Sequence, residues 1–108
     1  MYKTKIQDAK REAYFINRRL LHLPKSHLRI RIRKLYDVWA YAEETETGNY
    51  RTILNCEFPS YKLFRDVLAH ELIHQWQYYT GDPGTHNKNF FTWRKSFGRL
   101  GYDILKEY

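Results

Sequence analysis

The feature that most constrains this chain is a long segment between two strong interruptions of helical structure. Pro59-Ser60 precedes the segment, and Gly81-Asp82-Pro83-Gly84 follows it. Serine caps helix N-termini well, and a turn rich in glycine and proline ends a helix. We therefore expect a helix over residues 60–80 that supplies apolar side chains to the core, namely Leu68, Leu72 and Trp76.

This helix would carry His70-Glu71-Leu72-Ile73-His74, which has the spacing of an HExxH metal site. Positions four apart on a helix lie one turn above each other, so both imidazoles can point toward one ion while Glu71 lies beside it. Catalytic zinc usually takes three protein ligands and leaves a fourth position to water, whose pKa falls to about 7. The pattern predicts Zn2+ as cofactor, His70 and His74 as ligands, and Glu71 as the general base that activates the zinc-bound water.

A third ligand has to come from another part of the chain. His86 is the strongest candidate, because it follows the Gly81 to Gly84 turn, where the chain can double back from the end of the helix. Asp82 could also ligate through its carboxylate, but a turn explains it equally well. His22 and His27 are weaker candidates because they are distant in sequence.

The remaining segments predict one α+β domain over residues 1–108. Residues 2–21 have the apolar spacing of an amphipathic helix, and residues 28–33 alternate apolar and arginine side chains as a half-buried strand does. Residues 36–43 and 50–58 flank a polar turn and indicate a hairpin, and a last helix is expected over residues 87–100. The predicted order is N-terminal helix, three-stranded mainly antiparallel sheet, HExxH helix and C-terminal helix.

Composition narrows the setting in which such a domain would work. The 108 residues support one modest core, and Cys56 is the only cysteine, so neither an internal disulfide nor a cysteine-rich zinc ribbon is expected. No apolar run resembles a signal peptide or a bilayer span. We expect an intracellular, cytoplasmic monomer without a membrane partner.

The formal net charge of +7 favours contact with polyanions. Arg29, Arg31 and Arg33 would share one strand face, next to Lys34. Such a basic stripe would contact nucleic-acid phosphates or, more commonly, form a solvated outer face. Nucleic acid is therefore a candidate partner.

Two segments together resemble the SprT-like family of zinc metallopeptidases. They are residues 67–77, which contain the HExxH pattern, and His86-Asn87-Lys88-Asn89-Phe90, which is similar to the family's His-Gly-x-x-Phe element. Ile53-Leu54-Asn55 also resembles the strand beside the family's cleft. The resemblance covers most of the chain. It implies a minimal zincin-like domain, zinc bound by His70, His74 and His86, and Glu71 as the catalytic glutamate.

The sequence departs from the family pattern in two respects. Asn87 stands where the family commonly has glycine, and the C-terminal zinc ribbon of many members has no counterpart in these 108 residues. Some members cleave proteins crosslinked to DNA, and compact members without a ribbon look like those of bacteriophage genomes. The resemblance thus implies a protein or peptide substrate, DNA-associated in some cases, and the host cytoplasm as the location of a phage-encoded form.

Several residues near the motif have a functional and a structural interpretation. Tyr78 or Tyr79 would donate a hydrogen bond to an oxyanion or pack against the last helix. Asn55 would orient a peptide if its strand is an open edge, or it simply ends that strand. Four aromatic residues are assigned to the core: Trp76, Phe90, Phe91 and Trp93.

The leading hypothesis is a zinc-dependent endopeptidase. One alternative is a small zinc-dependent nuclease or other hydrolase, and another is a nucleic-acid-binding module with structural zinc. A glutamate next to the first histidine has no evident purpose in a closed metal site, so the structural-zinc alternative ranks last.

Overall fold

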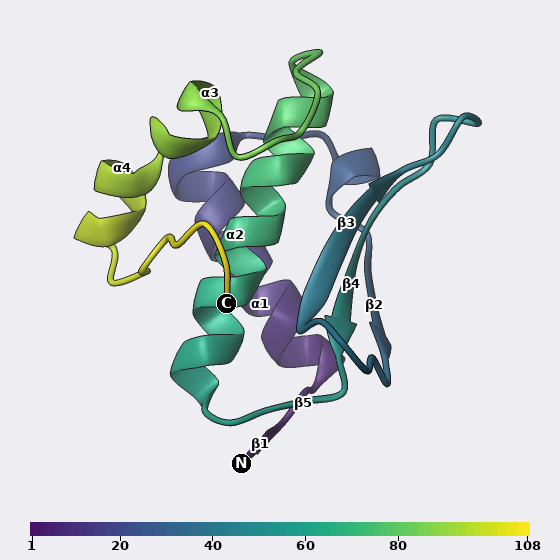
Figure 1. Cartoon of the computed structure of the whole chain (residues 1–108), viewed down its shortest axis with the longest axis vertical. Helices are drawn as coiled ribbons and strands as arrows, with labels where there is room; N and C mark the ends of the chain where they lie inside the picture. Colours follow the sequence, from purple (N-terminus) through teal and green to yellow (C-terminus); the bar gives the residue numbers. More distant parts are fainter.

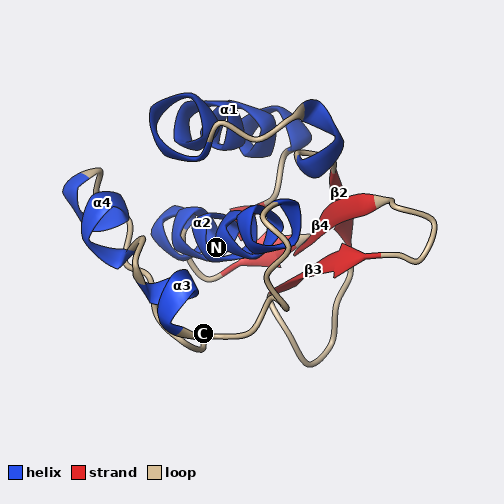
Figure 2. Cartoon of the chain, turned by 90° about the horizontal axis from the view of Figure 1, so that it is seen from above, coloured by secondary structure: helices blue, strands red, loops and turns tan.

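The computed structural model describes all 108 residues and confirms an α+β fold, with its helices to one side of a three-stranded sheet (Figure 2). The helices are α1 (Ile6–Ile16), α2 (Tyr61–Tyr79), α3 (Lys88–Phe91) and α4 (Arg94–Arg99). A π-helical turn, Asn17–Leu21, extends α1, and a 3-10 turn, Lys25–His27, leads toward the sheet. The strands are β1 (Tyr2–Lys3), β2 (Ile30–Arg33), β3 (Ala40–Glu44), β4 (Tyr50–Asn55) and β5 (Glu57–Phe58).

The strand order of the main sheet is β2-β4-β3, which corrects the prediction of a mainly antiparallel sheet. β3 and β4 form the expected antiparallel hairpin, but β2 pairs with β4 in parallel, with Ile30 opposite Thr52 and Arg33 opposite Asn55. The reason is that β2 and β3 run in opposite directions along the two outer edges, and β4 returns from the hairpin between them. Apolar periodicity fixes which residues share a face, but it does not fix which strands are neighbours.

Two predicted strand ranges were too long. The segment 50–58 is divided at Cys56: β4 ends at Asn55, and β5 pairs instead with β1 in a second, two-stranded sheet. Residues 36–39 form a loop before β3, and the buried Asn55 side chain holds this loop by donating to the carbonyls of Leu35 and Val38. At the N-terminus, residues 2–3 are a strand and the helix begins only at Ile6.

The long central helix agrees with its sequence signals. The Ser60 hydroxyl accepts a hydrogen bond from the Leu63 N–H at 3.1 Å and caps α2, which ends at Tyr79, and Gly81 then adopts a φ of +82°. The predicted helix over residues 87–100 is instead divided into α3 and α4. At the break, the Thr92 hydroxyl donates to the Asn89 carbonyl at 2.6 Å. This hydroxyl competes with the backbone for that carbonyl and bends the chain.

Helix α2 passes through the middle of the molecule, with α1 and the sheet packed against it (Figure 1). Its two flanks therefore meet different partners, and its middle turns are buried all round. One apolar cluster of 17 residues fills this space, and its contributors from α2 include Phe64, Val67, Leu68, Leu72 and Ile73. The consequence is that polar side chains on α2 near its middle lie in a largely water-free environment.

Candidate metal centre

The HExxH segment lies in the buried middle of α2. His70, Glu71 and His74 expose only 5%, 7% and 8% of their surface. Polar groups at this depth are costly unless they are paired or bind a ligand. The three polar side chains of the HExxH segment are therefore expected either to pair with one another and their neighbours or to bind a ligand.

The turn after α2 returns the chain to this site and delivers His86. It is organised by the Asp82 carboxylate, which accepts hydrogen bonds from the Gly84 N–H at 3.0 Å and the Asn89 amide at 2.8 Å. Asn87 caps α3 by accepting from the Phe90 N–H at 3.0 Å, and its amide also donates to Asp82 at 3.0 Å. These contacts explain why an asparagine is useful at this position. They also commit Asp82 to the turn, so it is not a ligand.

The remaining two histidines lie away from the site. His27 is buried against Tyr50, with ring centroids 3.8 Å apart, and His22 is an exposed residue with a left-handed φ of 53° after the π-helical turn. Neither joins the cluster of metal-ligand atoms, which contains His70, His74 and His86 alone.

The three predicted ligands converge through the same ring atom. The Nε2 atoms of His70 and His74 are 3.2 Å apart, those of His74 and His86 are 3.2 Å apart, and those of His86 and His70 are 3.0 Å apart. Two nitrogens bound to one tetrahedral zinc at about 2.0–2.1 Å are themselves about 3.3 Å apart. The triangle therefore has nearly the size that a metal ion with three imidazole ligands requires.

The outer nitrogens fix the tautomers of two of the rings. The Nδ1 atom of His70 lies 2.8 Å from the Leu105 carbonyl oxygen, which can only accept, so this nitrogen carries the proton. The Nδ1 atom of His74 lies 2.8 Å from Oε1 of Gln77. The Gln77 amide cannot be turned round, because its nitrogen donates to the Asp82 carboxylate and to the Thr85 carbonyl. His74 therefore also carries its proton on Nδ1.

Two unprotonated Nε2 atoms consequently face each other at 3.2 Å. Their lone pairs repel, and no hydrogen bond between them is available unless an extra proton enters. A cation between them removes the repulsion. Histidine ligands of metals are commonly held in this way, with the outer N–H donated to a carbonyl or a polar side chain. The donor set thus fits a metal ion on its own chemistry.

Electrostatics keep the three imidazoles neutral. Burial, followed by the neighbouring His74 and His86, lowers the pKa of His70 to about 3. Burial also lowers the pKa of His74, against an opposing contribution from Gln77, and it lowers the pKa of His86. Metal binding requires neutral imidazole, so the site has the protonation state of a ligand set over the physiological pH range.

Glu71 lines the same space as the histidines. A cavity of about 260 Å³ is bordered by Glu71 and the three histidines, by β3 and by Tyr78. Burial raises the pKa of Glu71 to about 8, and the backbone of Ala42 opposes this effect. A neighbouring cation would lower that pKa again, because it favours the carboxylate.

The hydrophobic wall of the site is Phe90. Its ring centroid lies 4.8 Å from those of His70 and His74 and 5.0 Å from that of His86. Phe90 is fully buried, so the three imidazoles rest against a fixed surface. This confirms its assignment to the core, and it adds that the same ring supports the ligand cluster.

No family model, curated protein or solved structure matches this chain. The interpretation of the site therefore depends on its geometry. That geometry supports a three-histidine centre that could hold a metal ion, formed by His70, His74 and His86. No helix is both long and apolar enough to span a bilayer.

Other predicted residues divide into those at the site and those away from it. Tyr78 borders the cavity, whereas Tyr79 is 54% exposed and packs edge-on against His27. Asn55 is not on an open edge, because β4 is the central strand. The stripe of Arg29, Arg31 and Arg33 is exposed, as expected of an outer face.

Two residues that orient the histidines were not identified from the sequence. Gln77 lies three positions after His74, so helical spacing could have indicated it. Leu105 acts through its backbone carbonyl, which has no signature in a sequence.

Proposed function

We propose that this protein is a zinc-dependent endopeptidase of the SprT-like type, with Zn2+ held by His70, His74 and His86 and with Glu71 as the catalytic base. The observation that carries the proposal is the pair of Nε2 lone pairs, fixed by Leu105 and Gln77, that face each other at 3.2 Å next to a buried glutamate. The packing of α2 against a sheet whose edge strand borders the site supports a minimal zincin-like architecture.

Zn2+ held by His70, His74 and His86 would supply Lewis-acid chemistry, which acidifies water and polarises a carbonyl group. The chain's own groups carry the protons. The Glu71 carboxylate takes a proton from the attacking water and delivers it to the leaving amine. The neutral histidines are held rigidly by Gln77, Leu105 and Phe90, so the site needs little rearrangement when it is loaded.

A peptide is favoured over a phosphodiester as the substrate because of the strand that borders the cleft. β3 is an edge strand in the order β2-β4-β3, and Ala40, Tyr41 and Ala42 line the cavity that contains Glu71. An extended peptide can pair with a free strand edge through its main chain, which positions successive amide bonds along the cleft. No lysine or arginine lines this cavity, although a site for a phosphodiester would need cationic side chains to bind the phosphate.

The basic stripe leaves nucleic acid as a second partner in this proposal. Arg31 and Arg33 are exposed on β2, and Arg29 is exposed just before it, whereas the cavity with Glu71 is bordered by β3, at the opposite edge of the sheet. Proteins associated with DNA are therefore substrates to include in a test. The nuclease and the structural-zinc module stay as alternatives that the same experiment separates.

The test combines metal content with turnover. Wild-type protein is expected to bind one zinc ion and to cleave an unstructured protein such as casein. Glu71→Gln should retain the zinc and lose about 10²–10⁴-fold in rate, because it lacks the general base. Glu46→Gln, in the exposed hairpin turn, is the matched control. Stoichiometric zinc without cleavage of any protein, or RNA or DNA hydrolysis that depends on Glu71, would refute the proposal.

A further inference from the structure

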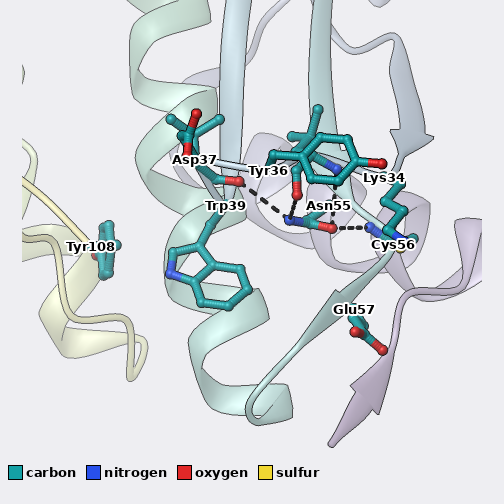
Figure 3. Close-up of a pocket in the computed structure, with 10 residues that line it drawn as sticks. Lys34, Tyr36, Asp37, Trp39, Asn55, Cys56, Glu57 and Tyr108 are labelled. Carbon is teal, nitrogen blue, oxygen red and sulfur yellow. Dashed lines mark hydrogen bonds between the residues drawn. The ribbon is translucent and has the colours of Figure 1, made fainter.

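A second cavity of about 360 Å³ lies next to the metal-centre cleft, between the loop before β3 and the C-terminal residue Tyr108 (Figure 3). It is connected to that cleft: Asp37, Val38, Trp39 and Tyr108 border both this cavity and a further one of about 340 Å³ that includes His70 and Glu71. A substrate whose bond lies at Glu71 would therefore pass directly along its opening.

The floor of this cavity is organised by Asn55. Its Oδ1 accepts from the Cys56 N–H at 2.8 Å and the Leu35 N–H at 3.4 Å, and its Nδ2 donates to the carbonyls of Leu35 at 3.0 Å and Val38 at 3.2 Å. Figure 3 shows these contacts at the centre of the cavity. Because all of the amide's hydrogen bonds are made within the protein, Asn55 shapes the loop and offers no polar group to a ligand.

The lining of the cavity is mixed: six of its ten residues are hydrophobic, and the others are polar or charged. Trp39 is half-buried and stacks on the core residue Phe58, with centroids 5.6 Å apart, and Tyr108 packs edge-on against His70. The charged lining residues Lys34, Asp37 and Glu57 are all exposed. Binding pockets of this size typically have apolar walls and few polar groups, and they select apolar groups of matching shape.

We propose that this cavity is a specificity pocket that receives a bulky aliphatic or aromatic side chain of the peptide substrate. The inference rests on the proposed function, since it assumes a peptide in the cleft. Three observations favour this occupant. The cavity shares lining residues with the cavity at the metal centre, Asn55 has no free hydrogen-bonding group to offer, and aromatic residues line the cavity. Asn55 is a positioning residue for the pocket.

One test of the pocket does not require turnover. Cys56 lines the cavity and is the only cysteine, so its alkylation reports on occupancy. In zinc-loaded Glu71→Gln protein, a peptide with phenylalanine or leucine near its centre should slow iodoacetamide modification of Cys56 at least about fivefold. The same peptide with alanine there should not protect it. Equal protection by both peptides, or by neither, would overturn the pocket.

A second test uses cleavage. Val38 is 50% exposed at the junction of the two cavities, so Val38→Asp should fold normally and place a charge in the opening. We expect wild-type protein to prefer bulky apolar residues at one position of a peptide library, and Val38→Asp to lower kcat/KM for those peptides by about tenfold or more. Rates for alanine peptides should fall by a clearly smaller factor, because their side chain does not reach the pocket. Tyr14→Asp, on exposed α1 surface, is the control.

The outcomes separate the two proposals. If peptides are cleaved with no side-chain preference, or if Val38→Asp keeps the preference of the wild type, the pocket proposal is refuted but the peptidase proposal is not. Absence of cleavage refutes the peptidase, and the pocket, which assumes a peptide in the cleft, then stands only if the peptide with the bulky residue selectively protects Cys56.

Discussion

Replacement of Gln77 by leucine tests whether this residue orients the metal ligand His74. In the native protein, the Gln77 side chain accepts from His74 Nδ1 at 2.8 Å and donates to Asp82 at 2.9 Å and to the Thr85 carbonyl at 2.8 Å. Leucine has a similar volume but no polar group. His74 Nδ1–H would lose its acceptor, and the ring would be free to protonate Nε2 instead. We expect zinc affinity to fall about 10–100-fold, the effect typical of losing such a partner.

The same change should also lower the free energy of unfolding, by about 1–3 kcal/mol, because buried polar groups lose a partner. Gln75→Leu is the matched control. Gln75 is also buried on α2, but its amide donates to the Arg51 carbonyl at 2.8 Å and not to a residue of the site. Competition titration with a chromogenic chelator gives zinc affinity, and urea denaturation in EDTA gives stability. Equal zinc affinity in the two variants would refute the proposed role of Gln77.

Three further predictions address the turn, the cleft and the core. Gly84→Ala should weaken zinc binding and lower the melting temperature, because Gly84 has a φ of +82° and an added Cβ would lie 2.5 Å from Tyr78 Cε1. The control is Gly48→Ala: Gly48 has a φ of +78° but an added Cβ would have no atom within 4 Å, so only the backbone strain should lower stability there. Tyr78→Phe should lower kcat about 10²-fold at unchanged zinc content if its hydroxyl stabilises the oxyanion, whereas Tyr79→Phe should have no effect. Glu12→Gln should destabilise the fold at pH 7 by about 1–3 kcal/mol. Burial raises the pKa of Glu12, but hydrogen bonds from Tyr61, Tyr102 and Arg65 outweigh it and lower that pKa overall. This contribution is present above the unfolded pKa, about 4.3, and is lost as pH falls through the folded value, so urea denaturation at pH 3 should show a smaller difference between wild type and Glu12→Gln.

The parts of the site that depend on local signals were predictable. Ser60 and the Gly81 to Gly84 turn bound α2 as expected, and helical spacing then places His70 and His74 on one face. The turn also returns His86 to that face, because a short connection between helices leaves few alternatives. The exposed arginines of β2 follow equally from the period of two.

The arrangement of the strands was not predictable in the same way. Whether β4 lies beside β2 depends on the path of residues 34–39, which is fixed by the Asn55 side chain and not by any repeat in the loop itself. Asn55 lies in the central strand and ends β4, so of its two predicted roles the structure agrees with the strand end, and its side chain in addition shapes the loop before β3. Long-range hydrogen bonds of this kind act between segments 17 to 20 residues apart, beyond the reach of pattern analysis.

The difference between local and long-range interactions also determines how strongly an HExxH pattern indicates a metal site. Spacing brings two imidazoles together, but it does not determine which nitrogen of each ring faces inward. Here that choice is made by a carbonyl at Leu105, 35 residues after His70, and by an amide at Gln77 that is itself held by Asp82 and Thr85. Without these partners the rings could turn and hydrogen-bond to one another. With them, two lone pairs are directed at one point, and a cation becomes the species that satisfies the site.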